Sequence, residues 1–220
     1  MGESKSNGLL VLLSAPSGGG KTTLCQQIVA THSNAVRAVT CTTRAPRPGE
    51  RDGVDYYFLD EGSFRGRIEA GEFLEHALVH GNWYGTQATE VLGQLAQGRD
   101  VLLSVDVQGA QAIREKARCD PMLSRALVTV FVMPASLRVL EERLRKRGTE
   151  APEVVQQRLS VARQEIAEWR HYDYLILSTS IAEDLRRLQS ILDAEKLRSV
   201  RWPSPPGEPP GLEPGRWTHE

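Results

Sequence analysis

The residues of this chain that are best suited to chemistry form one short loop directly after the apolar run Leu9–Leu13. The loop reads Ser14-Ala15-Pro16-Ser17-Gly18-Gly19-Gly20-Lys21-Thr22-Thr23. Consecutive glycines let the backbone curl until successive N–H groups point into one concavity, which suits a polyphosphate. Lys21 can reach the terminal phosphates, and the Thr22 hydroxyl can hold an accompanying Mg2+ ion. We therefore predict a polyphosphate site at Ala15–Thr23.

The first position of this loop departs from the general pattern, which is Gly, four residues, then Gly-Lys-Ser/Thr. Ala15 stands where that pattern has its first glycine. Alanine adds one methyl group and tolerates most backbone angles with negative φ, so we expect the loop to keep its shape. A purely structural turn is the alternative, but Lys21-Thr22 after the glycines is hard to explain by turn chemistry alone.

A second group of candidate residues lies in the run Thr40–Tyr56, which carries paired arginines. Arg44 and Arg47 are three positions apart, and prolines on both sides of Arg47 stiffen the backbone. A guanidinium group matches phosphate oxygens bidentately, and Tyr56 and Tyr84 can add hydroxyl donors. A solvated basic loop would explain the run taken alone. Beside a phosphate loop, it predicts a second phosphorylated substrate.

The elements that must position these residues follow from the hydrophobic pattern. Apolar runs typical of buried strands occur at Leu9–Ser14, Val101–Val105, Ala126–Met133 and Tyr174–Leu177. Helical periodicity occurs at Val107–Ala117, Leu137–Lys146, Pro152–Trp169 and Glu183–Leu197. This alternation predicts an α/β fold with a parallel sheet covered on both faces. Ligands bind beyond the carboxyl ends of such strands, so Ser14–Thr22 and Ser104–Asp106 are expected to share a site.

Interruptions of this alternation divide the chain into parts. Residues 40–89 are richer in Gly, Arg, Tyr and His, and we interpret them as an inserted subdomain. The core is then formed by residues 8–39 and 90–200, with an arginine-rich excursion at about 141–160. The tail, residues 201–220, holds six of the twelve prolines and is expected to be disordered.

Composition limits the classes of partner. The 220 residues carry a formal net charge of −1, which argues against a general nucleic-acid binder. No run approaches the roughly eighteen apolar residues that cross a bilayer, and the N-terminus lacks a signal-peptide pattern. Cys25, Cys41 and Cys119 are odd in number and far apart, and we interpret all three as small buried residues with reduced thiols. We therefore expect a cytoplasmic protein with no membrane partner.

Several motifs occur together in the order and approximate spacing of one enzyme family. They are Pro16-Ser17-Gly18, Thr42-Thr43-Arg44-Ala45-Pro46-Arg47-Pro48-Gly49-Glu50, Phe73-Leu74-Glu75, Gly81-Asn82-Trp83-Tyr84-Gly85-Thr86, Val105-Asp106-Val107-Gln108-Gly109 and Arg143-Leu144-Arg145-Lys146-Arg147-Gly148-Thr149. In these motifs the chain resembles the guanylate kinases, over about Leu9 to Arg198. The resemblance implies a P-loop nucleoside-monophosphate kinase fold, with a core parallel sheet, a GMP-binding subdomain at 40–89 and a small lid.

The same resemblance implies Mg2+-dependent transfer of the γ-phosphoryl group from ATP to GMP, giving ADP and GDP. ATP would bind at Ala15–Thr23, with the metal at Thr22. The positions that match the family's catalytic cations are Lys21, Arg143, Arg147 and Arg158. Those that match its GMP phosphate site are Arg44, Arg47, Tyr56 and Tyr84, and those around guanine are Thr40, Glu75, Thr86 and Asp106.

Physical chemistry supports two of these assignments. Guanine presents adjacent donors at N1 and N2, so one carboxylate can accept both while it repels the N1 lone pair of adenine. Glu75 can do this; a surface acid at the end of a helix is the alternative. In the basic run, Arg138, Glu141 and Glu142 each have an oppositely charged partner four residues later. Arg143 and Arg147 have no acid three or four residues earlier and repel each other, which favours an anionic ligand.

The chain also departs from the family pattern in two places. Ser104 stands where relatives commonly carry an acid that orients Mg2+, and Ser178-Thr179 replaces a common Asn-Asp pair, so we assign no adenine contacts. Two other functions stay open. One is a guanylate-kinase-like binding scaffold, which would not need Lys21, Thr22 or the lid arginines. The other is a P-loop kinase for another monophosphate; Glu75 and the paired arginines count against AMP and UMP but not against dGMP.

Overall fold

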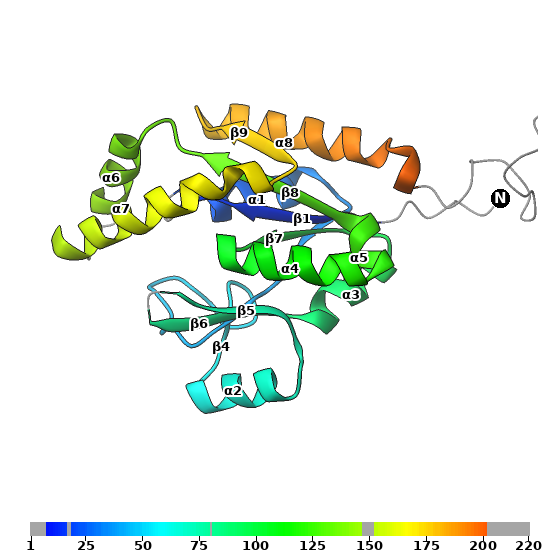
Figure 1. The fold of residues 1–220 in the computed structure, drawn as a ribbon, viewed down its shortest axis with the longest axis horizontal. Helices are drawn as coiled ribbons and strands as arrows, with labels where there is room; N and C mark the ends of the chain where they lie inside the picture. Colours follow the sequence, from blue (N-terminus) through cyan, green and yellow to red (C-terminus); the bar gives the residue numbers. More distant parts are fainter. Residues whose placement is uncertain (1–7, 17–18, 80, 147–151, 202–220) are drawn as a thin grey trace, which may run out of the picture.

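The computed structural model describes residues 8–16, 19–79, 81–146 and 152–201, and Figure 1 shows their arrangement. A parallel sheet forms the centre of the larger part. Its strands are β1 (Leu10–Ser14), β2 (Ala35–Arg37), β7 (Asp100–Ser104), β8 (Leu127–Met133) and β9 (Tyr174–Leu177), in the order β2-β7-β1-β8-β9. Each neighbouring pair runs parallel. The predicted α/β class and the four predicted core strands are thus confirmed, with ends shifted by at most one residue.

Both faces of this sheet are buried, because alternate residues of β1 point into separate cores. Leu9, Val11 and Leu13 pack with helices α1 (Lys21–Thr31) and α8 (Ile181–Lys196). Leu10 and Leu12 pack with α3 (Ala88–Ala96), α4 (Val107–Cys119) and α5 (Pro121–Ala126). Leu9 and the β1 residues Leu10–Leu13 are all fully buried, so the sequence here is a continuous apolar run.

A smaller sheet lies beside the core, on the far side of α4 (Figure 1). It orders its strands β4 (Tyr57–Phe58), β3 (Cys41–Thr42), β6 (Asn82–Gln87) and β5 (Phe73–Val79), and α2 (Glu61–Glu69) covers one face. Phe64 stacks on Phe73 at 4.6 Å between ring centroids, and Trp83 stacks on Phe64 at 5.9 Å. A Cβ at Gly85 would lie 2.9 Å from Phe64, so this glycine lets the aromatic cluster close on β6.

The helices α6 (Leu137–Lys146) and α7 (Pro152–Ala167) project from the carboxyl-end side of the core, and a 3-10 turn, Glu168–His171, follows α7. The two helices bury Leu140 against Val155 and Leu159. Two of the ion pairs expected along α6 are present, Arg145–Glu141 at 2.8 Å and Arg138–Glu142 at 3.8 Å. Their carboxylates and guanidinium groups are therefore occupied on the helix surface.

Two sequence-based expectations differ from the structure. Cys25 and Cys41 are buried, but Cys119 is exposed, because it is the last residue of α4. The expected tail began at residue 201, yet Arg201 is buried and ends a 3-10 turn, Ser199–Arg201. Residues 202–220 lie outside the described residues.

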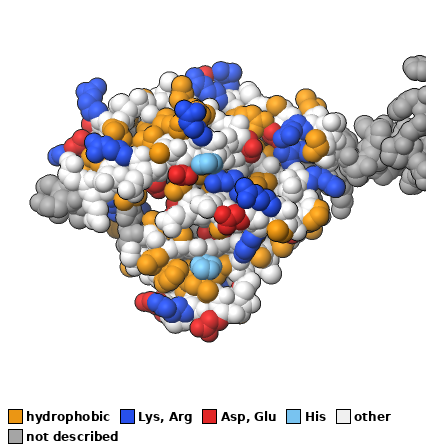
Figure 2. All heavy atoms as spheres, in the orientation of Figure 1, with side chains coloured by type: hydrophobic (Ala, Val, Ile, Leu, Met, Phe, Trp, Pro, Cys, Tyr) orange, Lys and Arg blue, Asp and Glu red, His pale blue; other side chains and the backbone are white. Residues whose placement is uncertain are grey.

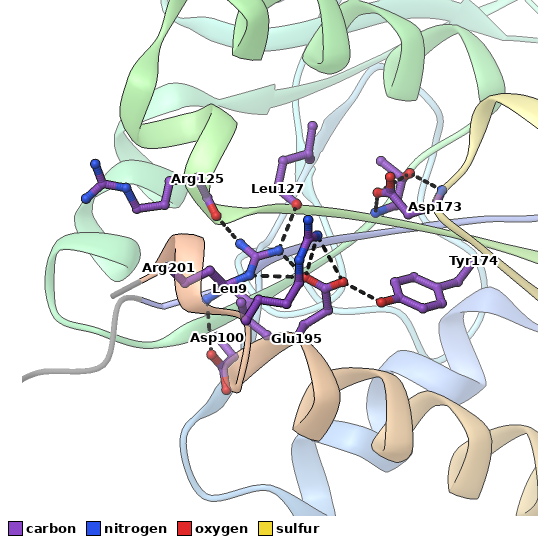
Figure 3. A network of polar contacts seen from close by, with 10 residues as sticks. Leu9, Asp100, Arg125, Leu127, Asp173, Tyr174, Glu195 and Arg201 are labelled. Atoms are coloured by element: carbon purple, nitrogen blue, oxygen red, sulfur yellow. Dashed lines mark hydrogen bonds and ion pairs between the residues drawn. The ribbon is translucent and has the colours of Figure 1, made fainter. Parts of the chain in front are cut away.

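A buried polar network closes the amino-end edge of the core sheet (Figure 3). Arg201 pairs with Glu195 and donates hydrogen bonds to the carbonyls of Arg125 and Leu127. Tyr174 donates its hydroxyl hydrogen to Glu195, and Asp100 accepts from the Leu9 amide at 3.1 Å while pairing with Lys196. Glu195 is 1% exposed, so the end of α8 is fixed to the strand starts by charged groups held away from water.

No helix in the described part of the chain has the length and apolar character needed to span a membrane.

Candidate active site

A cavity of about 440 Å³ lies where the carboxyl ends of β1 and β7 face the smaller sheet, a size typical of ligand pockets. Figure 2 shows the surface open between the core above and the smaller sheet below. The phosphate loop, the paired arginines, Glu75, Ser104 and Asp106 all line this cavity, together with Arg158 from α7. The sequence segments expected to share a site therefore do so.

The phosphate loop is shaped by glycines at its end. Gly20 has φ of +92°, a left-handed conformation that glycine adopts without strain, and it directly precedes α1. Gly19 donates its N–H to the Pro16 carbonyl at 2.8 Å and closes the turn. Lys21 donates to the carbonyl of Ala15. The loop thus presents the start of α1 and its positive dipole end to the cavity.

Ala15, the departure from the general loop pattern, is fully buried beneath this turn. Its methyl group lies where a side chain at Gly19 would need to be: a Cβ at Gly19 would sit 2.6 Å from the Ala15 Cβ and 2.9 Å from the Pro16 carbonyl oxygen. The alanine is accommodated because position 19 has no side chain. Ser17 and Gly18 lie outside the described residues.

The paired arginines are held by an acid that sequence reasoning did not single out. Glu50 accepts from Arg44 Nη2 with both carboxylate oxygens at 3.0 Å, and from the Arg47 amide at 2.7 Å. The guanidinium of Arg44 lies over the ring of Tyr56, 5.4 Å from its centroid, and Tyr56 meets Tyr84 edge-on at 6.1 Å. We call Arg44, Arg47, Tyr56 and Tyr84 the arginine–tyrosine grip.

Electrostatics keep Arg44 charged. Partial burial lowers the pKa of Arg44, but its hydrogen bonds to Glu50 and Tyr84 outweigh this, and the net pKa lies above the ordinary value. Burial raises the pKa of the Tyr56 hydroxyl, which therefore stays protonated and able to donate. The grip thus combines a fixed positive charge with a hydroxyl donor, the combination that binds a phosphate oxygen.

Glu75 lies on β5 at the inner end of the cavity and is 5% exposed, so the alternative of a surface acid on a helix is wrong. Its Oε1 accepts the hydroxyl hydrogen of Thr86 at 2.6 Å. Burial, together with a smaller effect of the neighbouring Asp106, raises the pKa of Glu75 to about 7 despite the hydrogen bond from Thr86, which lowers it. This carboxyl group is poised between its charged and neutral forms near neutral pH.

Gly109, in the first turn of α4, makes room for that carboxyl group. A Cβ there would lie 2.8 Å from Glu75 Oε2 and 3.3 Å from Asp106 Oδ1. Asp106 caps α4 by accepting from the Gly109 amide at 2.8 Å. The motif that resembles the family at Val105–Gly109 therefore places one acid, Asp106, beside Glu75 and leaves the space that the Glu75 carboxyl group needs.

The predicted site residues divide into three groups. Those lining the cavity are Pro16, Gly19, Gly20, Lys21, Thr22, Thr23, Thr40, Arg44, Arg47, Tyr56, Glu75, Tyr84, Asp106 and Arg158. Ala15 and Thr86 are fully buried and act behind the lining, on Gly19 and Glu75 respectively. Ser17, Gly18, Arg147 and the side chain of Arg143 lie outside the described part of the structure.

The donors near the phosphate loop are hard oxygens. The hydroxyls of Thr22 and Ser104 and the carboxylate of Asp106 line the same cavity. Mg2+ prefers oxygen ligands and keeps several waters and substrate phosphates in its shell, so it needs few protein groups. This donor set fits a magnesium ion that arrives with a nucleotide.

The last strand ends in a different arrangement from the Asn-Asp pair of relatives. Ser178 is buried and donates to Asp184 Oδ2 at 2.5 Å, and the Thr179 amide donates to Asp184 Oδ1 at 3.1 Å. Asp184 therefore holds the turn between β9 and α8. The Ser178 hydroxyl hydrogen is committed to this contact.

A parallel α/β sheet with a glycine-rich phosphate loop, facing a second anion grip across one cavity, defines a P-loop protein with sites for two phosphorylated ligands. Comparison with known proteins narrows this class. The profile of the guanylate kinase family matches residues 7–195. The chain belongs to the guanylate kinase family.

Individual relatives agree with this assignment. The guanylate kinase of Maricaulis maris is 44% identical over 199 residues, covering 90% of this chain and 88% of that protein. That of Symbiobacterium thermophilum is 45% identical, covering 90% of each. Among solved structures, the guanylate kinase of Anaplasma phagocytophilum superposes with a TM-score of 0.72 at 35% identity, covering 89% of this chain and 90% of that one.

Proposed function

We propose that this chain transfers the γ-phosphoryl group of ATP to GMP, giving ADP and GDP, within the cavity described above. The reaction is that of the family to which the chain belongs. The observation that carries the proposal is the joint placement of Lys21, the arginine–tyrosine grip and buried Glu75 around one cavity. Lys21 suits the polyphosphate of the donor nucleotide, the arginine–tyrosine grip suits the phosphate of the acceptor, and Glu75 suits the hydrogen-bonding edge of guanine.

Guanine recognition follows from the position of Glu75. The hydrogen bond from Thr86 fixes Oε1, and the gap at Gly109 leaves Oε2 beside Asp106. In its ionised form Glu75 accepts hydrogen bonds and has none to donate, which matches the N1 and N2 donors of guanine. A site built around such bonds rejects a base that lacks the donors. AMP and UMP are therefore poor substrates, whereas dGMP keeps the guanine edge and is accepted.

Phosphoryl transfer needs positioning and neutralisation of the charge on the transferred oxygens. Lys21, from the end of the phosphate loop, and Arg158, from α7, both line the cavity. We assign Arg143 and Arg147 to the same task by their match to the family motif. Thr22, with Ser104 and Asp106 near it, would hold Mg2+, which neutralises phosphate charge when it is bound. The arginine–tyrosine grip then holds the GMP phosphate in line with ATP.

The binding scaffold remains the main alternative from a different class. A scaffold has no need for the cations that line this cavity, Lys21, Arg44, Arg47 and Arg158. Several cations beside one cavity attract a polyphosphate, so their joint presence favours substrate binding over a scaffold role. We further propose that the protein works in the cytoplasm, where ATP and GMP occur together.

A substrate panel tests the function. Wild-type protein with ATP and Mg2+ is given GMP, dGMP, AMP or UMP in turn, and ADP release is followed by a coupled assay. We expect turnover with GMP and dGMP and at least about a hundredfold lower kcat/KM with AMP and UMP. Lys21→Met is the control that should abolish release. Absence of ADP release with GMP would favour the scaffold, and equal rates with AMP would favour a different kinase.

A further inference from the structure

Arg37 makes a contact between the two sheets that no sequence motif suggested. It is the last residue of β2, the edge strand of the core sheet. Its Nη2 donates to the carbonyl oxygen of Asp55 at 3.0 Å and to that of Val54. Both acceptors belong to the loop that precedes β4 of the smaller sheet. One guanidinium group therefore joins the core to the smaller sheet.

The loop that Arg37 holds is shaped by its own hydrogen bonds. Gly53, with φ of +71°, donates its N–H to the Tyr56 carbonyl at 2.8 Å, and Asp55 accepts from the Arg51 amide at 2.9 Å. The Val54 and Asp55 carbonyls point the other way, toward β2 and Arg37. The loop is thus held by its own hydrogen bonds, by the pairing of the following strand β4 with β3, and by Arg37 on the side of the core sheet.

The position of this loop matters because Tyr56 follows it directly. Tyr56 lies under the Arg44 guanidinium and against Tyr84 in the arginine–tyrosine grip. The backbone leaves the core after Arg37 and enters β3 at Cys41, so residues 38–40 form a short connection between the two sheets. Arg37 spans this connection and also lines the cavity.

We propose that Arg37 is a positioning residue for the acceptor nucleotide: it fixes the loop before Tyr56 to the core sheet and so places Tyr56 in the arginine–tyrosine grip. The inference rests on the proposed function, since it assigns the grip to GMP. A planar guanidinium with several donors in a fixed fork can hold two adjacent carbonyls, whereas a lysine ammonium acts as a point charge. Substrate binding then finds Tyr56 already in place, which lowers the cost of ordering the site.

Steady-state kinetics of Arg37→Met test this role. We expect KM for GMP to rise roughly tenfold, as for loss of charge-assisted hydrogen bonds, with KM for ATP and kcat changed by less than about twofold. Arg37→Lys should give an intermediate KM. Arg65→Met is the matched control, because Arg65 is an exposed arginine of the smaller sheet's helix that pairs with Glu61. Unchanged KM for GMP, or equal rises for both substrates, would overturn the proposal.

A double-mutant cycle separates positioning from a direct contact with phosphate. If Arg37 acts by placing Tyr56, then Arg37→Met should have little further effect on KM for GMP once Tyr56→Phe has removed the hydroxyl. Additive effects of the two changes would show that Arg37 acts independently and would contradict the proposal. Wild-type turnover with GMP, measured in the same assay, tests the proposed function separately, so the two failures are distinguishable.

Discussion

Glu75 is a carboxyl group whose surroundings disfavour its charged form. It is 5% exposed and next to Asp106, and burial raises its pKa to about 7. The folded protein therefore binds a proton that the unfolded chain would release between pH 4.5 and 7. The free energy of unfolding therefore falls as pH rises through this window, and the full cost of ionising buried Glu75 is reached above pH 7. The N1 and N2 donors of guanine compensate for the negative charge of Glu75, so guanine binding offsets the free-energy cost of burying that charge.

The change Glu75→Gln tests this residue in two ways. In wild type, kcat/KM for GMP should fall roughly tenfold from pH 8 to pH 6 as Glu75 takes up a proton and loses an acceptor. The variant should have at least about tenfold lower kcat/KM at pH 8 and lack this pH dependence, apart from that of the GMP phosphate itself. Thermal or urea unfolding without substrate at pH 8 should show the variant more stable, by up to about 3 kcal/mol. Equal stability and an unchanged pH profile would contradict the raised pKa.

At the scale of single residues, sequence reasoning identified cavity-lining residues whose type or motif indicates a contact with a phosphate or a base. Lys21 after glycines and Arg44 with Arg47 were identifiable from residue type and spacing, and Glu75 from a motif that resembles a family. Glu50 and Arg37 were not, since their roles depend on which backbone and side-chain groups the fold brings to them. Gly109 was quoted only as part of a motif. A glycine is needed at position 109 because the Glu75 carboxyl group occupies the space of a side chain there, and only the folded structure shows this contact.

At the scale of elements, the phosphate loop departs from the general sequence pattern at Ala15, and a glycine packed against that position accommodates the extra methyl group. Ala15 fits because Gly19 has no side chain. The two positions are therefore coupled: the methyl group occupies one of them only if the other is glycine. A sequence pattern treats each position separately and cannot express this dependence.

The coupling predicts the effect of Gly19→Ala. Its Cβ would meet the Ala15 methyl at 2.6 Å and the Pro16 carbonyl at 2.9 Å, so the loop must shift. We expect KM for ATP to rise about ten- to a hundredfold, with KM for GMP within about twofold. The double change Ala15→Gly with Gly19→Ala should recover only part of the loss, because the contact with Pro16 remains. Initial rates at varied ATP measure this, and an unaltered KM for ATP would disprove the coupling.

The core elements were predictable and those of the smaller sheet were not, for a physical reason. Strands β1, β7, β8 and β9 are continuous apolar runs because both faces are buried. Strands β3 and β4 have two residues each, too few for any period. Their partners in the chain are distant, as in the pairing of Cys41 with Gly85. Composition distinguished residues 40–89 from the core, but only the aromatic cluster around Phe64 shows how these residues pack.

At the scale of the whole molecule, the charges that line the cavity and those of the buried network lie at opposite ends of the core strands. The cavity lies at the carboxyl ends of the strands, and the network of Glu195, Arg201 and Asp100 lies at the amino ends. Burial alone would raise the pKa of Glu195, but hydrogen bonds from Tyr174 and Arg201 outweigh it and lower the pKa. The carboxylate therefore contributes stability above its unfolded pKa, which is lost as pH falls through the folded value.

A pair of substitutions on α8 separates buried from surface ion pairs. Glu195→Ala leaves Arg201 buried without its carboxylate and should cost about 3–5 kcal/mol of unfolding free energy at pH 7. Glu183→Ala removes an acid that pairs with Arg186 and Arg187 on the surface and should lower the unfolding free energy far less. Urea unfolding measures both. The kcat of folded Glu195→Ala should match wild type, and equal costs for the two variants would contradict a stabilising network.

The network also determines how the enzyme can be handled. Leu9, near one end of the described fold, and Arg201, at the other, both lie at the amino ends of the core strands, away from the cavity. Linkers joined next to Gly8 or Arg201 therefore start on the side of the core opposite to the cavity. Immobilisation on a support, or fusion to another domain, through these points leaves the mouth of the cavity open.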